Sequence, residues 1–317
     1  MQDAPHDIGR LWELDAAALT QDESLRAYLI RQGFDASQVR YADRTFVNAV
    51  GERIEEVSAL AALAEIHETS NGSGDFRILD GYDHLIAHLA QGLDIRLDTP
   101  VNRIEWSAAG VKVHTTADVY EAQQVIITLP LGVLQSGTIT FTPELPAHKL
   151  EAIHHLRMGP GLKMLYRFAE PILPPTVSAL FSDCVPPMWW SPSFGQSTEQ
   201  TVWTAFATGD WARQLLALGE AGALAQGLET LRYELGRPDL QPEAMRMMNW
   251  VDEPYTRGAY SVATPGFADV RDQIATPLDG VLYWAGEHTA SHGNAATVHG
   301  AYTSGQRAAQ EVLNRAR

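Results

Sequence analysis

The residues best placed to do chemistry stand near the end of the chain, in two short segments joined by a polar loop. The first segment is Ala285-Gly286-Glu287-His288-Thr289, and the second is Thr297-Val298-His299-Gly300-Ala301-Tyr302. The second opens a run of apolar and small residues at helical spacing, which predicts a helix. The first N–H groups of a helix have no partner within it and carry partial positive charge. The pattern therefore predicts an anion-binding crevice at this loop.

A buried strand and a slender helix must hold this crevice in place. Val281-Leu282-Tyr283-Trp284 is a short apolar run after an Asp279-Gly280 turn, which is typical of a strand buried on both faces. Small residues then recur along the predicted helix, so that it can lie close to another backbone or to a flat ligand. They are Gly300, Ala301, Gly305 and Ala308.

Both segments closely resemble the C-terminal flavin-binding signature of the flavin-containing amine oxidases, the family that includes the monoamine and polyamine oxidases. The resemblance implies FAD as the cofactor, with Glu287 on its sugar-like chain and Gly286, Thr297 and Val298 in the same site. It also implies that the helix start faces the pyrimidine edge of the flavin ring. Reduced flavin is negative there, and a helix N-terminus stabilises such charge by about 1 kcal/mol.

The resemblance continues upstream, in the same order along the chain, from Gly81 onward. It implies that Val101 is a backbone contact for the adenine end of FAD, although a strand core residue would look the same. The run Val125 to Leu129 predicts a buried strand, and Pro130, which follows it, belongs to the implied cofactor site.

Lys163 is the first candidate catalytic residue. Leu162, Met164 and Tyr166 alternate on one face of a predicted strand, so Lys163 points to the other face. A lysine in this position is usually exposed to solvent. The family resemblance implies instead a lysine that is linked through water to the flavin N5 atom. A fixed cation there would stabilise the negative charge that develops on oxygen.

The stretch Trp250 to Tyr260 also resembles the family, in which the tryptophan and the final tyrosine stand near the flavin face. Such an aromatic wall accepts the body of an alkylamine. Members that attach FAD covalently carry a cysteine where this chain has Ala259, so we expect non-covalent FAD. Members of the family that enclose the amine between two tyrosines place the second tyrosine where Thr297 stands in this chain. The resemblance therefore implies an aromatic cage that is half open, closer to the polyamine-oxidase pattern than to the monoamine-oxidase pattern.

The resemblance implies a mixed α/β fold, namely the two-domain FAD/NAD(P)-binding fold of the amine oxidases with an inserted substrate domain of sheet and helices. Local patterns add a helix after a Thr20–Glu23 capping box and a strand at Ile95 and Leu97. The predicted parts are a helical part of the substrate domain (1–77), FAD-binding segments (78–158 and 266–317) and the rest of the substrate domain (159–265).

The chain of 317 residues contains no G-x-G-x-x-G turn of the kind that binds the FAD pyrophosphate. Gly72-Ser73-Gly74 lacks the third glycine and a preceding strand. We therefore expect an incomplete fold, with three explanations open: a split enzyme whose nucleotide-binding half is a second polypeptide, a truncated product, or a flavin-free descendant that acts as a binding module or scaffold. The presence of Lys163, Trp250, Tyr260 and Glu287 favours the first two.

Composition narrows the possible partners. The net charge of −16 argues against nucleic acid and against anionic membrane surfaces. Cys184 is the single cysteine and no apolar stretch is long enough to cross a bilayer, so a cytoplasmic protein is the default expectation. Glu287, His288, His292 and His299 resemble a metal cluster only in composition, since their loop is not a continuous helix, and we expect no metal site.

The sequence thus predicts an FAD-dependent amine oxidoreductase. The reaction implied is hydride transfer from the carbon beside a neutral primary or secondary amine, or a polyamine, to flavin N5, followed by reoxidation by O2 with release of H2O2. Lys163, Trp250, Tyr260 and Thr297 are the predicted catalytic residues. The alternatives are a desaturase-like or porphyrinogen-oxidase-like flavoenzyme that acts on a carbon substrate, and the flavin-free module.

Overall fold

The computed structural model describes residues 8–15, 19, 21–67, 78, 81–196 and 201–315. Its first part is helical. The elements are a 3-10 helix η1 (Ile8–Glu13), α1 (Leu25–Arg31), α2 (Ala36–Ala42), a π-helical turn η3 (Asp43–Val47), α3 (Asn48–Val50) and α4 (Ala59–His67). The hydroxyl of Ser24 caps α1, and the chain turns after it at Gly33, where φ is +81°. The predicted cap Thr20 lies outside the described residues.

The second group of elements surrounds the C-terminal strand and helix. A four-stranded sheet has the order β3-β2-β1-β5, from β1 (Val101–Ser107), β2 (Gly110–Thr115), β3 (Val119–Ala122) and β5 (Thr140–Thr142). Beside it, β4 (Val125–Ile127) pairs in parallel with β13 (Leu282–Trp284). The helices of this group are α5 (Tyr82–Leu89), α6 (Leu131–Gln135), α7 (Ala147–His155), α10 (Val270–Ala275) and α11 (Val298–Arg315).

Two of the strand predictions for this group are confirmed and one is wrong. All residues of β13 are buried, and β4 begins at the predicted Val125 but ends at Ile127. Ile95 and Leu97 form no strand and are 54% and 79% exposed. Their alternation is apolar, but no neighbouring strand within the described residues offers hydrogen bonds to that segment.

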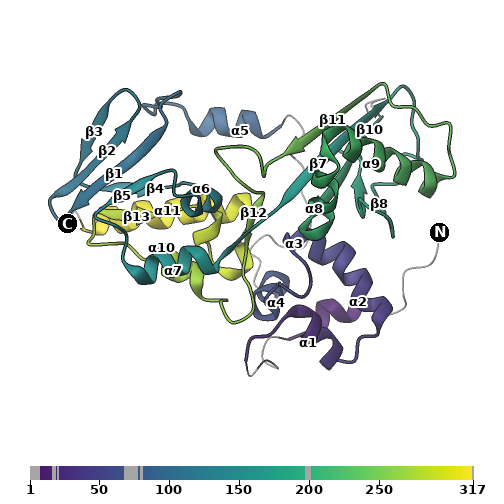
Figure 1. The fold of residues 1–317 in the computed structure, drawn as a ribbon, viewed down its shortest axis with the longest axis horizontal. Coiled ribbons are helices and arrows are strands. Elements are labelled where there is room, and N and C mark those ends of the chain that lie inside the picture. The colour runs from purple at the N-terminus through teal and green to yellow at the C-terminus, as the bar shows by residue number, and fades with distance from the viewer. Residues whose placement is uncertain are drawn as a thin grey trace.

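The third group is a five-stranded sheet with two covering helices. Its order is β11-β7-β10-β9-β8, from β7 (Gly161–Phe168), β8 (Ala179–Phe181), β9 (Met188–Trp190), β10 (Thr201–Thr208) and β11 (Ala244–Asn249). The helices are α8 (Gly209–Ala217) and α9 (Gly219–Leu235). Figure 1 shows the β1 sheet and this sheet at opposite ends of the molecule, with α1 to α4 below them and α5 alone along the top.

A two-stranded pair joins these groups near the candidate site. In it, β6 (Arg157–Gly159), directly before β7, pairs with β12 (Tyr260–Val262). Two short 3-10 turns, η4 (Glu287–Thr289) and η5 (His292–Asn294), then lead into α11. Buried apolar residues gather in one cluster per group: around Leu63 in the helical part, around Trp284 in the second group and around Tyr166 in the third. The domain boundaries at residues 77, 158 and 265 stay predictions.

Every helix in the described ranges falls short of the length or the apolar character needed to cross a membrane. The fold is mixed α/β, as predicted.

Candidate functional site

Lys163 lies in β7, which is paired on both sides, with β10 and with β11. Leu162, Met164 and Tyr166 are fully buried on one face of the strand, so Lys163 is on the other, as the alternation predicted. Its ammonium nitrogen lies 5.5 Å from the ring centroid of Trp250. The structure therefore brings together two of the predicted catalytic residues.

Two further rings complete the surroundings of this ammonium, and the sequence analysis missed both. The Lys163 nitrogen is 5.3 Å from the centroid of Trp190 and 5.8 Å from that of Phe206. Aromatic faces attract a cation, whereas burial lowers the pKa of Lys163. No carboxylate among the described residues pairs with it. Phe206 stands directly opposite Lys163 across the β7–β10 pair, so only knowledge of the strand register would have found it.

Trp250 and Tyr260 begin and end a tight turn. The Gly258 amide and the Thr256 hydroxyl both donate to the Trp250 carbonyl, at 2.9 and 2.8 Å. Tyr260 begins β12, and its hydroxyl donates to the Ala49 carbonyl at 2.5 Å. Gly51, with φ of +106°, leaves room for the Tyr260 ring, since a Cβ there would lie 2.6 Å from it. Burial raises the pKa of Tyr260.

Glu287 connects β12 to the loop before α11. Its Oε1 accepts from the Ser261 amide at 3.1 Å, and its Oε2 accepts from the Ser261 hydroxyl at 2.6 Å and the Ala296 amide at 3.1 Å. The Ser261 hydroxyl in turn accepts from Arg271 Nη1 at 2.5 Å, and the Ser261 carbonyl accepts from Arg271 Nη2 at 3.0 Å. Sequence reasoning missed Ser261 and Arg271, which carry no motif of their own.

The start of α11 is exposed and supplies free amides. The Thr297 hydroxyl accepts from the Gly300 amide at 3.0 Å, so it caps the helix, and donates to the Asn294 carbonyl at 2.7 Å. Val298 is 57% exposed. Among the described residues, no acceptor lies on the Val298 and His299 amides. A helix start of this kind favours a negative group.

Small residues set how closely α11 packs. Its buried positions are Gly300, Ser304 and Ala308, one helical turn apart, and a Cβ on Gly300 would collide with the Asn294 carbonyl. The Ser304 hydroxyl accepts from the Gly286 amide at 2.9 Å. Gly286 has φ of +134°, and a Cβ there would lie 2.6 Å from the His288 ring. The predicted slender helix and its close approach are therefore both present.

Val101 and Pro130 lie among the elements around β13. Val101 begins β1 and packs against the Trp284 cluster. Pro130 precedes α6 and its carbonyl accepts from the Val133 amide at 3.0 Å. The next turn touches the Trp250–Tyr260 stretch, because a Cβ on Gly132 would lie 2.6 Å from the Thr256 carbonyl oxygen. Val101 forms no hydrogen bond with Glu287 or Lys163, so its role in cofactor binding stays a prediction.

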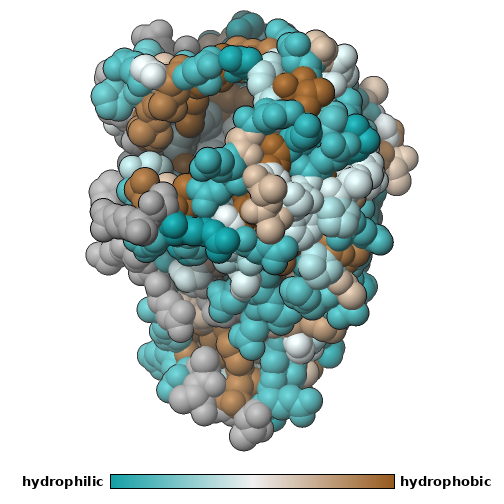
Figure 2. Space-filling view, turned by 90° about the vertical axis from the view of Figure 1, so that its left-hand side faces the viewer, coloured by the Kyte–Doolittle hydropathy of each residue, from teal (hydrophilic) through white to brown (hydrophobic). Residues whose placement is uncertain are grey.

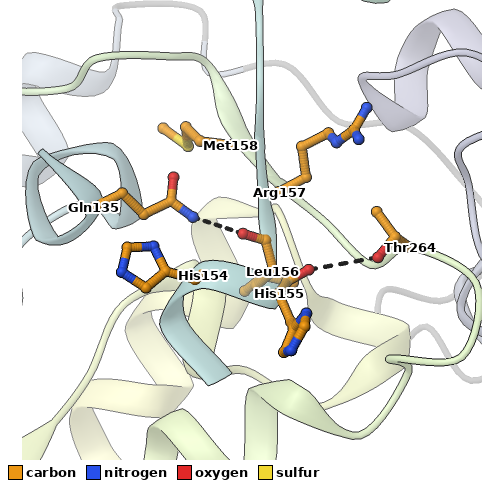
Figure 3. A pocket seen from close by; sticks show the side chains of 7 residues that line it. All are labelled: Gln135, His154, His155, Leu156, Arg157, Met158 and Thr264. Atoms are coloured by element: carbon orange, nitrogen blue, oxygen red, sulfur yellow. Dashed lines mark hydrogen bonds between the residues drawn. The ribbon is translucent and has the colours of Figure 1, made fainter. Parts of the chain in front are cut away.

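A surface hollow at the end of α7 lies apart from these residues. It has a volume of about 480 Å³ and contains none of the predicted site residues. Figure 3 shows its lining at the end of α7, where the Gln135 amide points to the Leu156 carbonyl and the Arg157 side chain runs away from it. His154 and His155 are exposed beside it. Gln135 and Thr264 donate to backbone carbonyls and Arg157 pairs with Glu52 and Glu56, so the hollow gives no reason to move the site.

The residues described provide no group of three or more His, Cys, Asp or Glu side chains that could hold a metal ion. Of the cluster considered from the sequence, the His292 side chain lies outside the described residues. The His299 ring contacts the Thr297 hydroxyl at 3.1 Å. His288 is buried, 2% exposed, so its surroundings are those of a core residue.

The buried His288 leads to a pH prediction. Burial, and then the nearby Arg271 charge, lower the pKa of His288 to about 3. Between pH 6.5 and that value the unfolded chain binds a proton that the folded chain does not, so stability falls as the pH falls. One pKa unit corresponds to about 1.4 kcal/mol, so the free energy of unfolding should drop by about 2 kcal/mol between pH 6.5 and 5. Urea titrations should show this dependence weakened in His288→Leu; an unchanged dependence would contradict the assignment.

Comparison with known proteins assigns the family. The family model described as flavin containing amine oxidoreductase matches residues 10–313. Lysine-specific histone demethylase 1B of Mus musculus is 35% identical over 332 residues, which cover 96% of this chain and 40% of the mouse protein. Polyamine oxidase 4 of Oryza sativa subsp. japonica is 36% identical over 254 residues, which cover 78% and 51%. The chain thus spans about half, or less, of the curated relatives that it matches.

Solved structures support the same fold. Wild-type putrescine oxidase bound to putrescine gives a TM-score of 0.80 at 22% identity, over 96% of this chain and 70% of that chain. Cyclohexylamine oxidase from Brevibacterium oxydans IH-35A gives 0.75 at 18% identity, over 96% and 71%. With the match over residues 10–313, the chain belongs to the family of flavin-containing amine oxidoreductases.

Proposed function

We propose that the protein is a flavin-dependent amine oxidase that oxidises a primary or secondary amine or a polyamine. The observation that carries the proposal is the position of Lys163, whose ammonium lies among Trp190, Phe206 and Trp250 without a carboxylate partner among the described residues. A partly buried cation that no carboxylate among the described residues neutralises suits a site where negative charge develops during the reaction.

The residues present fit a bound flavin. The free Val298 and His299 amides are donors for a negative ring edge, and the positive φ of Gly286 lets backbone approach a ligand closely. When bound, FAD would supply the hydride acceptor and the route of electrons to O2, which leaves as H2O2. In this proposal Glu287 and the α11 amides bind the cofactor, and Val101 and Pro130 contact its remaining parts.

The remaining roles belong to the substrate. Trp250 and Tyr260 would orient the alkylamine by their ring faces and keep water from its reacting carbon. Thr297 uses its hydroxyl within its own turn, so in this proposal it shapes the site and leaves it wider than a second aromatic ring would. The reacting amine must be neutral at its nitrogen, which an uncharged wall favours, because burial raises the pKa of Tyr260 and keeps its hydroxyl protonated.

Formation of hydrogen peroxide tests this function. The purified, flavin-loaded protein should release H2O2 with members of a panel of monoamines, diamines and polyamines, and a Trp250→Ala variant should lose most of this activity. Flavin reduction by a carbon substrate without an amine would instead support a desaturase-like or porphyrinogen-oxidase-like enzyme. A protein that binds no flavin under any condition would overturn the proposal.

We expect the flavin to be held without a covalent bond. Ala259 offers no sulfur for a thioether, and its methyl group lies beside Gly161, where an added Cβ would be 2.7 Å away. Acid precipitation should therefore leave yellow flavin in the supernatant and a colourless pellet. Flavin fluorescence that migrates with the denatured polypeptide on a gel would contradict this expectation.

A second polypeptide with a G-x-G-x-x-G turn is the partner we propose. Helix α5 has no buried residue, and apolar side chains on it and after it are exposed. They include Tyr82, Leu85, Ile86, Leu89, Leu93, Ile95 and Leu97. Figure 2 shows apolar side chains gathered around a hollow in the upper part of the molecule. An exposed apolar surface of this kind, in a fold where, within the described ranges, β4 and β13 form a parallel sheet of only two strands, suits a partner that adds strands.

Hydrogen exchange can test that partner. A polypeptide encoded beside this chain and carrying the G-x-G-x-x-G turn should co-purify with it. Amide exchange in residues 82–97 should slow on complex formation, whereas exchange in the exposed turn around residues 194–196 should not change. Co-purification without protection of 82–97 would place the interface elsewhere and overturn this part of the proposal.

A further inference from the structure

One buried amide side chain joins the helical part to the sheet that carries Lys163. Asn48 begins α3, directly after the π-helical turn η3, and is fully buried. Its Oδ1 accepts from the Thr208 amide at 2.9 Å, and its Nδ2 donates to the Phe206 carbonyl at 3.4 Å. The Thr208 hydroxyl donates to the Asn48 carbonyl at 2.7 Å. Asn48 is thus bonded to the end of β10 through both its side chain and its backbone.

These bonds stand where the next residue of a neighbouring strand would be. Strand β9 pairs with β10 as far as Phe206, so Thr208, two residues later, lies beyond that pairing. The primary amide of Asn48 supplies the acceptor that Thr208 would otherwise find on a strand. A buried N–H without an acceptor is costly, so Asn48 fixes where the end of β10 lies.

The π-helical turn explains how Asn48 comes to face β10. The Asn48 amide donates to the Asp43 carbonyl, five residues back. Such a turn contains one residue more than an α-helical turn, which rotates the residues after it around the helix axis. The segment that follows packs closely on the same end of β10, because a Cβ on Gly209 would lie 3.0 Å from the Glu52 carbonyl carbon. The local backbone therefore holds Asn48 in place.

The strand end that Asn48 holds carries one of the rings around Lys163. Phe206 stands opposite Lys163 across the strand pair, and its ring centroid is 5.8 Å from the ammonium nitrogen. The carbonyl of the next residue, Ala49, accepts from the Tyr260 hydroxyl. The Cα atoms of consecutive residues are about 3.8 Å apart. One short segment therefore fixes the Phe206 and Tyr260 rings relative to each other.

We propose that Asn48 is a positioning residue, which holds the Phe206 ring against the Lys163 ammonium and so keeps the aromatic surroundings of that cation in place. It acts through β10, since its hydrogen bonds go to Phe206 and Thr208. A ring displaced by even 1 Å would change the environment of the ammonium. The effect on the oxygen half of the reaction rests on the proposed function, whereas the placement of Phe206 does not.

Lysine NMR tests this placement without flavin or substrate. The chain contains three lysines, Lys112, Lys149 and Lys163, so protein labelled with ¹³C at the lysine Cε carbons gives three such signals. The signal that is lost in Lys163→Met belongs to Lys163 and reports the rings around it. In Asn48→Ala this signal should move, because Phe206 is no longer held. The Lys112 signal, from β2 in another sheet, should stay in place.

Asn48→Asp makes the effect depend on pH. A protonated carboxyl can donate to the Phe206 carbonyl as the amide does, whereas a carboxylate can only accept. Since burial raises the pKa of such a carboxyl, the Lys163 signal should differ from wild type at about pH 8 and return toward it at about pH 5.5. Asn48→Ala should show no return. Wild type at each pH is the reference, because burial raises the pKa of the nearby Asp43 to about 6.

Gln124→Glu is the matched control for this variant. It makes the same change from amide to carboxyl, and Gln124 Nε2 likewise donates to a backbone carbonyl of a distant segment, that of Gly280, at 3.2 Å. The residue lies beside β4, away from β10, so the Lys163 signal should match wild type at both pH values.

The possible outcomes separate this inference from the proposed function. An unchanged Lys163 signal in Asn48→Ala, and in Asn48→Asp at both pH values, would overturn the positioning role even if the protein oxidises amines. A signal that moves, and returns in acid only in Asn48→Asp, would establish it even if no amine is oxidised. In the flavin-loaded, active protein, Asn48→Ala should also slow reoxidation by oxygen roughly 10-fold, and a wild-type rate would contradict the link to the reaction.

A second pair of variants gives the same decision should the Asn48 variants fold poorly. Thr208→Val removes the hydroxyl that donates to the Asn48 carbonyl and keeps the shape of the side chain, whereas Thr208→Ser keeps the hydroxyl. The Lys163 signal should move in the valine variant and stay near its wild-type position in the serine variant. Equal Lys163 signals in the two variants would contradict the inference.

Discussion

Replacing Lys163 by methionine will slow reoxidation of the reduced protein by oxygen roughly 10²-fold. Methionine keeps the length and the contacts with the three rings but removes the fixed positive charge. That charge would act on the oxygen half of the reaction, whereas hydride removal from a neutral amine does not need it. Anaerobic reduction by the amine should therefore change much less, and stopped-flow absorbance would measure both rates separately.

Arg167→Met is the matched control for this variant. Arg167 lies on the same strand and the substitution also removes one cation, but its side chain is 60% exposed and pairs with Glu243 at 3.4 Å. Both half-reactions should keep their wild-type rates. Equal slowing of the two half-reactions in Lys163→Met would contradict the proposed role and point to a general distortion of the site.

Replacing Glu52 by glutamine will lower the free energy of unfolding by about 3 kcal/mol. The Glu52 side chain is fully buried and accepts from Arg213 Nη1 at 2.8 Å and Nη2 at 2.5 Å, with Arg157 Nη1 at 3.5 Å. These arginines come from α8 and β6, so the carboxylate joins the helical part to both. Its removal leaves Arg213 with only Asp210 and Arg157 with only Glu56 as acidic partners, and urea unfolding should show a lower midpoint with an unchanged slope.

The pH dependence of this effect has a defined sign. Burial alone would raise the pKa of Glu52, but the hydrogen bonds and charge of Arg213, with the charge of Arg157, hold that pKa below its ordinary value. The stabilisation is therefore present above about pH 4.5, the usual value of a free glutamate, and is lost as the pH falls through the folded-state pKa. The difference between wild type and Glu52→Gln should shrink in acid.

Glu56→Gln provides the comparison for Glu52. Its carboxylate pairs with Arg157 at 3.0 Å and Arg53 at 2.8 Å, but the side chain is 29% exposed, so the expected loss is below about 1 kcal/mol. The double variant Glu52→Leu with Arg213→Met should recover much of the lost stability, because it removes the buried carboxylate together with the guanidinium that pairs with it at 2.5 Å. Equal losses in Glu52→Gln and Glu56→Gln would show that burial of the ion pair is not what matters.

Sequence reasoning succeeds here where short-range patterns decide the structure. The apolar run before Trp284 and the small residues after Val298 define β13 and α11 by their local spacing alone. Alternation likewise separates Lys163 from Leu162 and Met164. These patterns are properties of neighbouring residues, so no knowledge of the rest of the fold is needed.

The failures share a different origin. The alternation at Ile95 and Leu97 predicted a strand, but a strand exists only where another strand pairs with it. Phe206 meets Lys163 through the register of β7 and β10, which periodicity does not reveal. Sequence order likewise separates Glu287 from Ser261 and Arg271, and only the fold brings the three into one hydrogen-bonded network.

The hydrogen bonds at Ser261 have a fixed direction. A guanidinium can only donate hydrogen bonds, so the Ser261 hydroxyl accepts from Arg271. The single proton of this hydroxyl is then donated to the Glu287 carboxylate. Glu287 is thereby surrounded by donors alone, namely that hydroxyl and the amides of Ser261 and Ala296. Any polyol that settles against this side chain has to turn a hydroxyl proton toward it. The network thus selects for a ligand that presents a hydrogen-bond donor to Glu287, whatever contacts the rest of the ligand makes.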